Sequence, residues 1–257
     1  MKKSTVTIKN LKLNKENTNI CVPVLEKTVV EAIKEGKQAG IAQPDLMEIR
    51  LDLLEENQLG NAQDIFIALR GHMPYLPLLA TYRSQGEGGN GKMDAKGVFG
   101  LYRAIDASGC VDMVDLEMSW DPAILQEGLE HFTQKGVATL VSYHNFDGTP
   151  TVEEMVNQFI QGEQMGADLV KIAVMPQSPK DVAGLFAACA NAWDVLTIPY
   201  VGISMGDLGK ITRIGASTFG SCMTFAAEKN KTSAPGQIET TKLRRVLEIL
   251  NDEDDTP

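Results

Sequence analysis

The run Asp168-Leu169-Val170-Lys171-Ile172-Ala173-Val174 places a lysine in the middle of an apolar segment that has the length of a β-strand. Side chains alternate between the two faces of a strand, so Val170, Ile172 and Val174 share one face and Lys171 lies on the other. The apolar face is suited to packing against helices. If the strand belongs to a parallel barrel, Lys171 points into the interior of that barrel.

Seven more apolar runs share this character and alternate with longer amphipathic stretches. The eight expected strands are Ile20–Leu25, Leu46–Leu53, Leu76–Arg83, Met113–Met118, Ala138–His144, Leu169–Val174, Ile198–Ser204 and Thr218–Thr224. Expected helices include Thr28–Ala39, Ala95–Ala107, Pro122–Gln134, Val152–Met165 and Gln237–Leu250. This alternation predicts an α/β fold with parallel strands, and the count matches a closed (β/α)8 TIM barrel. A doubly wound open sheet has the same alternation and stays open as an alternative.

The residues before the first expected strand are a separate element. Val6 to Leu13 alternates apolar and polar residues, which predicts a short N-terminal β-hairpin outside the repeat. No low-complexity linker interrupts the chain. We therefore expect residues 1–257 to form a single (β/α)8 barrel domain, a size at which such barrels are common.

The composition excludes several classes of partner. The net charge is −10, which argues against a nucleic-acid or membrane partner. The four cysteines are scattered without a C-x-x-C pair, so neither a zinc site nor a disulfide framework has support. The start of the chain carries no apolar signal-peptide segment, and no apolar run approaches the ~20 residues of a membrane-spanning helix. We expect a cytoplasmic enzyme.

Strand alternation sends polar side chains from four other strands into the same interior. They are Glu48, Arg50, Thr81, Arg83, Asp115, Glu117, Ser142 and His144. A single inward pair would ordinarily be a structural ion pair, because buried charge is costly unless it is paired. Convergence from five strands favours an active site instead, and sites of this fold lie at the carboxyl ends of the strands.

Lys171 and His144 are the candidates for chemistry. A buried ammonium loses hydration, which favours the neutral amine and makes Lys171 a nucleophile toward carbonyl groups. The alternative is a structural lysine paired with Glu48 or Asp115. The chain has three histidines, and only His144 stands at the end of an expected strand, where a general acid/base is useful.

A glycine-rich segment between the third strand and the next helix formally matches the dinucleotide-binding pattern G-x-G-x-x-G. It reads Gly86-Glu87-Gly88-Gly89-Asn90-Gly91, followed by Lys92 and Met93. Met93 stands where a P-loop has Ser or Thr, and Glu87 would direct a carboxylate at the phosphates. The third strand is also an unusual place for this fingerprint, which normally opens the fold. We therefore do not expect a nucleotide site.

Several segments carry a resemblance to a known family. They are Glu48–Asp52, Thr81–Ser84 with Glu87–Gly89, Ser142–Phe146, Gly166–Ala173, Ser204–Gly206 with Arg213, Phe219–Ser221 and Ser233–Gln237. Each is weak alone, but their order and content resemble type I 3-dehydroquinate dehydratase over nearly the whole chain. The resemblance implies a (β/α)8 barrel, usually a homodimer, that needs no metal or organic cofactor. It also implies conversion of 3-dehydroquinate to 3-dehydroshikimate in the shikimate pathway.

The resemblance further implies roles for individual residues. Lys171 would form an imine with the C3 ketone, His144 would move protons at C2 and at the C1 hydroxyl, and Glu87 would orient His144. Arg213 would bind the substrate carboxylate, and the loop Asn230–Gln237 would act as a lid. The implied substrate-binding residues are Cys21, Glu48, Arg50, Arg83, Met205, Arg213, Phe225, Ser233 and Gln237. Cys21 stands where members of the family often have serine, which leaves its contact open.

Two other functions compete with this one. A class I aldolase would share Lys171 but would break a carbon–carbon bond. A non-catalytic binding or scaffold barrel would simply pair off its inward charges. Recognition of a carboxylate by Arg213 under the Ser233–Gln237 segment separates the dehydratase from the aldolase.

Overall fold

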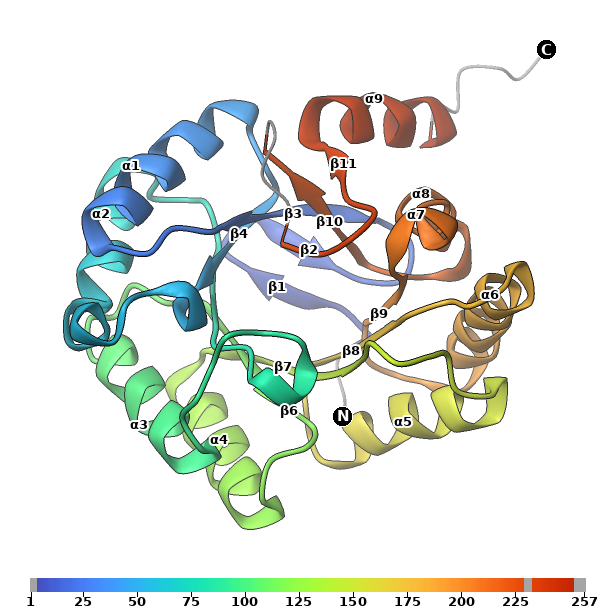
Figure 1. Cartoon of the computed structure of the whole chain (residues 1–257), viewed down its shortest axis with the longest axis horizontal. Coiled ribbons are helices and arrows are strands. Elements are labelled where there is room, and N and C mark those ends of the chain that lie inside the picture. The colour runs from blue at the N-terminus through green and yellow to red at the C-terminus, as the bar shows by residue number, and fades with distance from the viewer. Residues whose placement is uncertain (1–3, 229–232, 252–257) are drawn as a thin grey trace.

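The computed structural model describes residues 4–228 and 233–251, in which strands and helices alternate as expected. The strands of the repeat are β3 (Asn19–Val24), β4 (Leu46–Arg50), β5 (Leu78–Thr81), β6 (Met113–Glu117), β7 (Ala138–Asn145), β8 (Leu169–Val174), β9 (Tyr200–Ser204) and β10 (Met223–Ala227). The helices are α1 (Val29–Ala39), α2 (Gln63–His72), α3 (Ala95–Asp106), α4 (Pro122–Lys135), α5 (Val152–Gln164), α6 (Pro179–Val195), α7 (Gly206–Gly209), α8 (Thr212–Gly215) and α9 (Thr240–Asn251). Figure 1 shows the strands at the centre and the helices in a ring around them.

The strands close into a barrel. The parallel order runs from β10 through β3, β4, β5, β6, β7 and β8 to β9. β9 then meets β10 at a bridge between Tyr200 and Ser221, where the amide of Cys222 donates to the Tyr200 carbonyl at 2.9 Å. A further two-residue strand, β11 (Ile238–Glu239), pairs with the other end of β10. The closed (β/α)8 barrel is confirmed, and the open sheet is excluded.

The predicted N-terminal hairpin is confirmed as the floor of the barrel. β1 (Val6–Ile8) pairs antiparallel with β2 (Leu11–Leu13), and Leu13 is fully buried. Leu13 belongs to the same apolar cluster as Leu46 and Leu169, the first residues of β4 and β8. In Figure 1 the hairpin lies across the centre of the ring. It therefore seals the amino-terminal end of the barrel.

The interior of the barrel has an apolar lower part, and its buried polar groups lie above it. Val170, Ile172 and Val174 pack outward with residues of α5 and α6, as strand alternation predicts. Inside, the apolar cluster of the floor gives way to the buried polar residues Glu48, Thr81, Arg83, Asp115, Glu117, Ser142 and Lys171. The lower part stabilises the barrel by burying apolar surface, and the buried polar groups lie at the end where sites of this fold are found.

Local signals explain where elements begin and end. α5 starts at a capping box, in which the side chains of Thr151 and Glu154 each accept a hydrogen bond from the other residue's main-chain amide. The expected strand Thr218–Thr224 is wrong in position. Residues 216–219 form a 3₁₀ turn, and Gly220 turns the chain with φ 80° before β10 begins. A side chain at Gly220 would overlap the Tyr200 hydroxyl, which donates to the Phe219 carbonyl at 2.5 Å.

A second strand also differs from the expected one. The expected strand Leu46–Leu53 is shorter, because Leu51–Leu53 is a 3₁₀ turn. Among the helices of the described residues, none combines the length and apolarity needed to cross a membrane.

The sealed floor leads to a stability prediction. Leu13→Ala should lower the free energy of unfolding by about 2–5 kcal/mol, because it opens a cavity beneath the strands. The exposed neighbour Lys12, on the same strand, provides the control, and Lys12→Ala should change stability by less than about 0.5 kcal/mol. Urea denaturation measures both. Equal midpoints for the two variants would contradict the role of the hairpin as a floor.

Candidate active site

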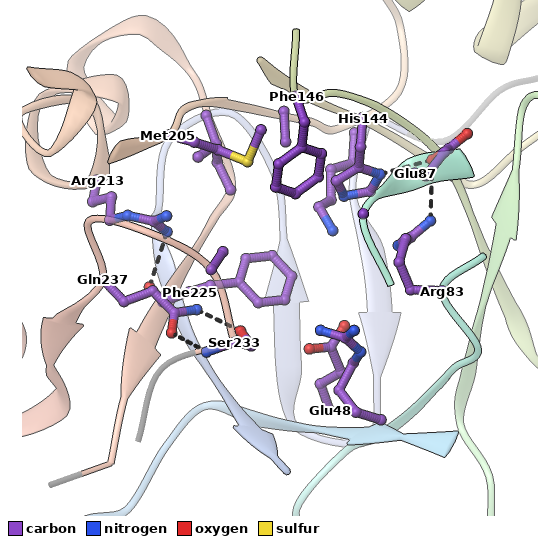
Figure 2. Close-up of a pocket in the computed structure, with 16 residues that line it drawn as sticks. Glu48, Arg83, Glu87, His144, Phe146, Met205, Arg213, Phe225, Ser233 and Gln237 are labelled. Carbon is purple, nitrogen blue, oxygen red and sulfur yellow. Dashed lines mark hydrogen bonds and ion pairs between the residues drawn. The ribbon is translucent and has the colours of Figure 1, made fainter. Parts of the chain in front are cut away.

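A cavity opens at the carboxyl ends of the strands. It is lined by Glu48, Arg50, Arg83, Glu87, Gly88, His144, Phe146, Lys171, Ala173, Ile203, Met205, Arg213, Phe225, Ser233, Ala234 and Gln237. Figure 2 shows these side chains arranged around one space. The structure thus brings together every predicted site residue except Cys21.

Lys171 stands in the middle of β8 with 5% of its surface exposed. Its Nζ lies 3.9 Å from Asp115 Oδ2 and 4.5 Å from the centroid of the Phe225 ring. Burial lowers the pKa of Lys171, and the positive charge of Arg83 acts in the same direction, while Asp115 and Glu48 oppose it. A lowered pKa increases the fraction of neutral amine, which is the nucleophilic form.

His144 forms a pair with Glu87 at the mouth of the barrel. The Nδ1 atom of His144 lies 2.8 Å from Glu87 Oε2. Burial holds the pKa of His144 well below 6.5, and the charges of Arg83, Lys171 and Arg50 act in the same direction, so the imidazole is neutral. When Glu87 is ionised it only accepts hydrogen bonds, and Nδ1 then carries the proton while Nε2 keeps its lone pair as a base.

Glu87 is the most strongly perturbed carboxylate of the cavity wall. Burial and, to a smaller extent, the nearby carboxylates of Glu117 and Asp115 raise its pKa to about 7. Arg83, at 3.2 Å, and the hydroxyl of Ser119, at 3.0 Å, oppose the rise. Glu87 therefore changes its charge near neutral pH, and with it the hydrogen bond that it accepts from His144.

The glycine-rich segment is the loop that presents Glu87. Glu87 ends a 3₁₀ turn, and Gly88 follows with φ 78°, a conformation that favours glycine. A Cβ at Gly88 would overlap the Phe146 ring, and one at Gly89 would overlap the Arg83 carbonyl. A Cβ at Gly91 would overlap the Tyr82 ring. Close packing of the loop thus requires Gly88 and Gly91, two of the three glycines of the formal nucleotide fingerprint.

Arg83 forms ion pairs with the carboxylates beneath the cavity. Its Nη2 atom lies 2.5 Å from Asp115 Oδ2, and its Nη1 atom lies 3.0 Å from Glu117 Oε1. Nη1 also donates to Ser142 Oγ at 2.9 Å. The inward charges are thus largely paired, as the structural hypothesis expected. Lys171 and the His144–Glu87 pair nevertheless face the cavity.

Glu48 and Arg50 form the wall on β4. Glu48 accepts a hydrogen bond from the Thr81 hydroxyl at 2.9 Å, which fixes one of its oxygens. Arg50 makes a two-pronged contact with Asp52, with distances of 2.8 and 2.9 Å. The two side chains place a carboxylate acceptor and guanidinium donors on one side of the cavity.

Arg213 stands opposite, on α8, and is almost fully buried. It donates to the carbonyls of Phe225 at 3.2 Å and Pro235 at 3.0 Å, while its Nε has no partner in the described part of the chain. Burial lowers its pKa to about 10, so it stays cationic at neutral pH. Among the described residues, no carboxylate forms a salt bridge with this guanidinium, which suits it to bind an anionic ligand.

The described part of the predicted lid, residues 233–237, lies over the Arg213 side of the cavity (Figure 2). The Gln237 amide donates to Ser233 Oγ at 2.7 Å and accepts from the Ser233 amide at 2.8 Å. The Gly206 amide donates to the Pro235 carbonyl at 3.2 Å, which seats the segment on α7. Residues 230–232 of the predicted lid lie outside the described residues.

Cys21 is the predicted site residue that the structure places elsewhere. It is fully buried in the apolar cluster below the cavity and does not line it. Sequence reasoning also missed some wall residues, notably Phe146 and Ala173. Strand alternation could have indicated Ala173, which follows Lys171 by two positions on the same face. Phe146 lies beyond the end of β7, where alternation no longer applies.

Comparison with known proteins agrees with this geometry. The 3-dehydroquinate dehydratase of Klebsiella pneumoniae is 36% identical over 250 residues, covering 96% of this chain and 99% of the relative. That of Clostridioides difficile is 35% identical over 251 residues, covering 97% and 98%. The crystal structure of 3-dehydroquinate dehydratase from Geobacillus kaustophilus superposes with a TM-score of 0.92 at 35% identity, covering 97% of each chain.

A family model tests the assignment over the whole barrel. The model described as type I 3-dehydroquinase matches residues 20–254, from β3 to beyond α9. Together with the near full-length relatives, this match shows that the chain belongs to the type I 3-dehydroquinase family.

Proposed function

We propose that Lys171 and His144 carry out the reaction of this family, the dehydration of 3-dehydroquinate to 3-dehydroshikimate in the shikimate pathway. Family membership makes the enzyme a hydro-lyase that works through a Schiff base. The observation that carries the residue assignment is the cavity itself. It holds a buried lysine, a histidine–carboxylate pair and a cationic Arg213 on separate walls.

The first step is imine formation. The neutral amine of Lys171 attacks the C3 carbonyl, and the oxygen of that carbonyl leaves as water after proton transfers. The product is a protonated imine, which withdraws electrons from C2 far more strongly than the ketone does. The nearby carboxylate of Asp115, 3.9 Å from the lysine nitrogen, stabilises the positive charge of this intermediate.

His144 takes part in both proton transfers that follow, first as a base and then as an acid. His144 Nε2 removes a proton from C2, and the electron pair moves toward the imine nitrogen to give an enamine. The enamine then expels the C1 hydroxyl, to which His144 returns the proton, so that water leaves. Addition of water to the conjugated imine frees the ketone product and restores the Lys171 amine. Glu87 stabilises the imidazolium that exists between the two proton transfers.

The remaining wall residues bind the substrate. Arg213 pairs with its carboxylate, and Glu48, Arg50 and Arg83 bind its hydroxyl groups. Met205 and Phe225 contact the apolar faces of the ring, and Ser233 and Gln237 close the cavity over it. The unpaired cation of Arg213 favours this function over an aldolase, and the open cavity beside Lys171 favours it over a scaffold.

The setting of the enzyme is part of the proposal. The order of motifs resembles a family that is usually dimeric, so we expect a homodimer. The cysteines in the described residues are free, and Cys21, Cys189 and Cys222 are buried, which suits a reducing cytoplasm. Each chemical step above uses a side chain of the enzyme, so the mechanism calls on no cofactor.

Borohydride reduction tests the imine. Treatment of the protein with 3-dehydroquinate and sodium borohydride should attach the substrate covalently to Lys171, because reduction converts the imine into a stable secondary amine. Peptide mass spectrometry locates the adduct. Lys210→Arg, at a solvent-exposed lysine, is the control and should label as the wild type does. An adduct on another lysine, or none, refutes the assignment of Lys171.

The variant His144→Ala separates imine formation from proton transfer. It should still give the Lys171 adduct, because the amine is untouched. Turnover, followed by the absorbance of the conjugated enone product, should fall by about 100-fold or more, the usual contribution of a general acid/base. Normal turnover in this variant would rule out His144 as the acid/base.

The pKa of Glu87 predicts a pH profile. Protonated Glu87 cannot accept the Nδ1 proton as a carboxylate does, so kcat/KM should rise with pH through about 7 as Glu87 ionises. Glutamine does not titrate, so Glu87→Gln should lose this limb. Initial rates from about pH 5 to pH 9 reveal it. A limb that stays near 7 in Glu87→Gln would mean that another group controls it.

A further inference from the structure

Asp52 is a buried carboxylate that the mechanism does not use. It stands in the 3₁₀ turn just after β4, its side chain has no exposed surface, and it does not line the cavity. An ionised group so deeply buried must be compensated by several donors. Its partners therefore reveal what it holds in place.

These partners belong to two different walls of the active site. Both oxygens of Asp52 bind the guanidinium of Arg50, at 2.8 and 2.9 Å. The Asn90 amide also donates to Oδ2, at 3.1 Å. Burial alone would raise the pKa of Asp52, but Arg50 and hydrogen bonds from the main-chain amides of Asn90 and Arg83 bring it below its ordinary value. Asp52 thus links a side chain of β4 to the Asn90 end of the loop that carries Glu87.

That loop is tied into a closed ring. The Gly89 amide donates to the Ser84 carbonyl at 2.8 Å, and the Gly91 amide donates to the Arg83 carbonyl at 2.9 Å. On the far side, Glu117 accepts from the Ser84 amide at 2.8 Å. A ring held this tightly moves as one body, so its anchors set where Glu87 lies. Asp52 is the anchor on the β4 side, and Glu117 is the anchor on the β6 side.

We propose that Asp52 is a positioning residue of the dehydratase, which fixes Arg50 for substrate binding and the Glu87 loop for proton transfer. This inference rests on the proposed function. Loss of Asp52 frees Arg50 to leave the cavity wall, which weakens substrate binding. It also lets the loop shift away from β4, so that Glu87 no longer supports His144 and catalysis slows.

A double-mutant cycle tests both links. Asp52→Asn keeps the shape of the side chain, and it should raise KM and lower kcat, each by about 10-fold or more, as outer-shell partners do elsewhere. Arg50→Gln should raise KM alone. In the Arg50→Gln background, Asp52→Asn should leave KM unchanged and still lower kcat by about 10-fold. A purely structural role would lower the melting temperature without this separation of KM from kcat.

A control variant separates failure of the proposed function from failure of the role proposed for Asp52. Glu56→Gln removes an exposed carboxylate from the following turn and should behave as the wild type does. The wild type and Glu56→Gln must turn over 3-dehydroquinate and form the Lys171 adduct, so failure of the proposed function is seen there. The role of Asp52 is overturned if Asp52→Asn has wild-type kinetics, or if it costs no kcat in the Arg50→Gln background.

A second pair of variants decides the matter if Asp52→Asn does not fold. Asn90→Pro removes the amide hydrogen that Asp52 accepts, whereas Asn90→Ala keeps it. The exposed side chain of Asn90 is lost in both variants. Asn90→Pro should have a kcat lower by about 10-fold than Asn90→Ala, with a similar KM. Equal kcat values for the two would overturn the link between Asp52 and the Glu87 loop.

Discussion

The guanidinium of Arg83 is the group on which the buried polar groups of the barrel depend. Asp115, Glu117 and Glu87 all lie within 3.2 Å of it, and mutual repulsion in a buried space would otherwise force protons onto them. Asp115 approaches Arg83 at 2.5 Å but Lys171 only at 3.9 Å. Arg83 therefore takes the carboxylate that would otherwise fix Lys171 as an ammonium. The lysine is left weakly paired, as its proposed role as a nucleophile requires.

The same arrangement gives the acid/base pair its working range. Arg83 stabilises the charged form of Glu87 while burial and two neighbouring carboxylates oppose that form, so the balance falls near neutrality. The positive charge of Arg83 also disfavours a second cation on His144 before substrate arrives. Burial and Arg83 thus both favour a neutral His144, and Arg83 also favours the ionised form of Glu87. Neither effect needs a group from outside the barrel.

Strand alternation was sufficient to predict the inward residues, because β8 has no break in its pattern and its bounds match the expected run Leu169–Val174. The pattern failed at β10, because Thr218 and Phe219, the first residues of the expected strand, belong to a 3₁₀ turn. The pairing of the charged side chains could be predicted only in part. Sequence reasoning offered Glu48 or Asp115 as partners for Lys171, but it could not show that Arg83 stands closer to Asp115. Whether Arg83 or Lys171 lies closer to Asp115 depends on distances between side chains of three strands.

The segment over the cavity contacts α7 through main-chain atoms, while the side chains of Ser233 and Gln237 face the cavity. A Cβ at Gly236 would overlap the Gly206 carbonyl, and the seating bond joins the Gly206 amide to the Pro235 carbonyl. Ser233 and Gln237, which face the cavity, take no part in that contact. The Gln237 side chain also accepts from the Ser233 amide, so its exchange would loosen the segment itself. Exchange of Ser233 alters the cavity wall and leaves the Gly206–Pro235 contact in place. We therefore expect evolution or protein engineering to adjust the shape of the cavity at Ser233 while the cover still docks in the same place.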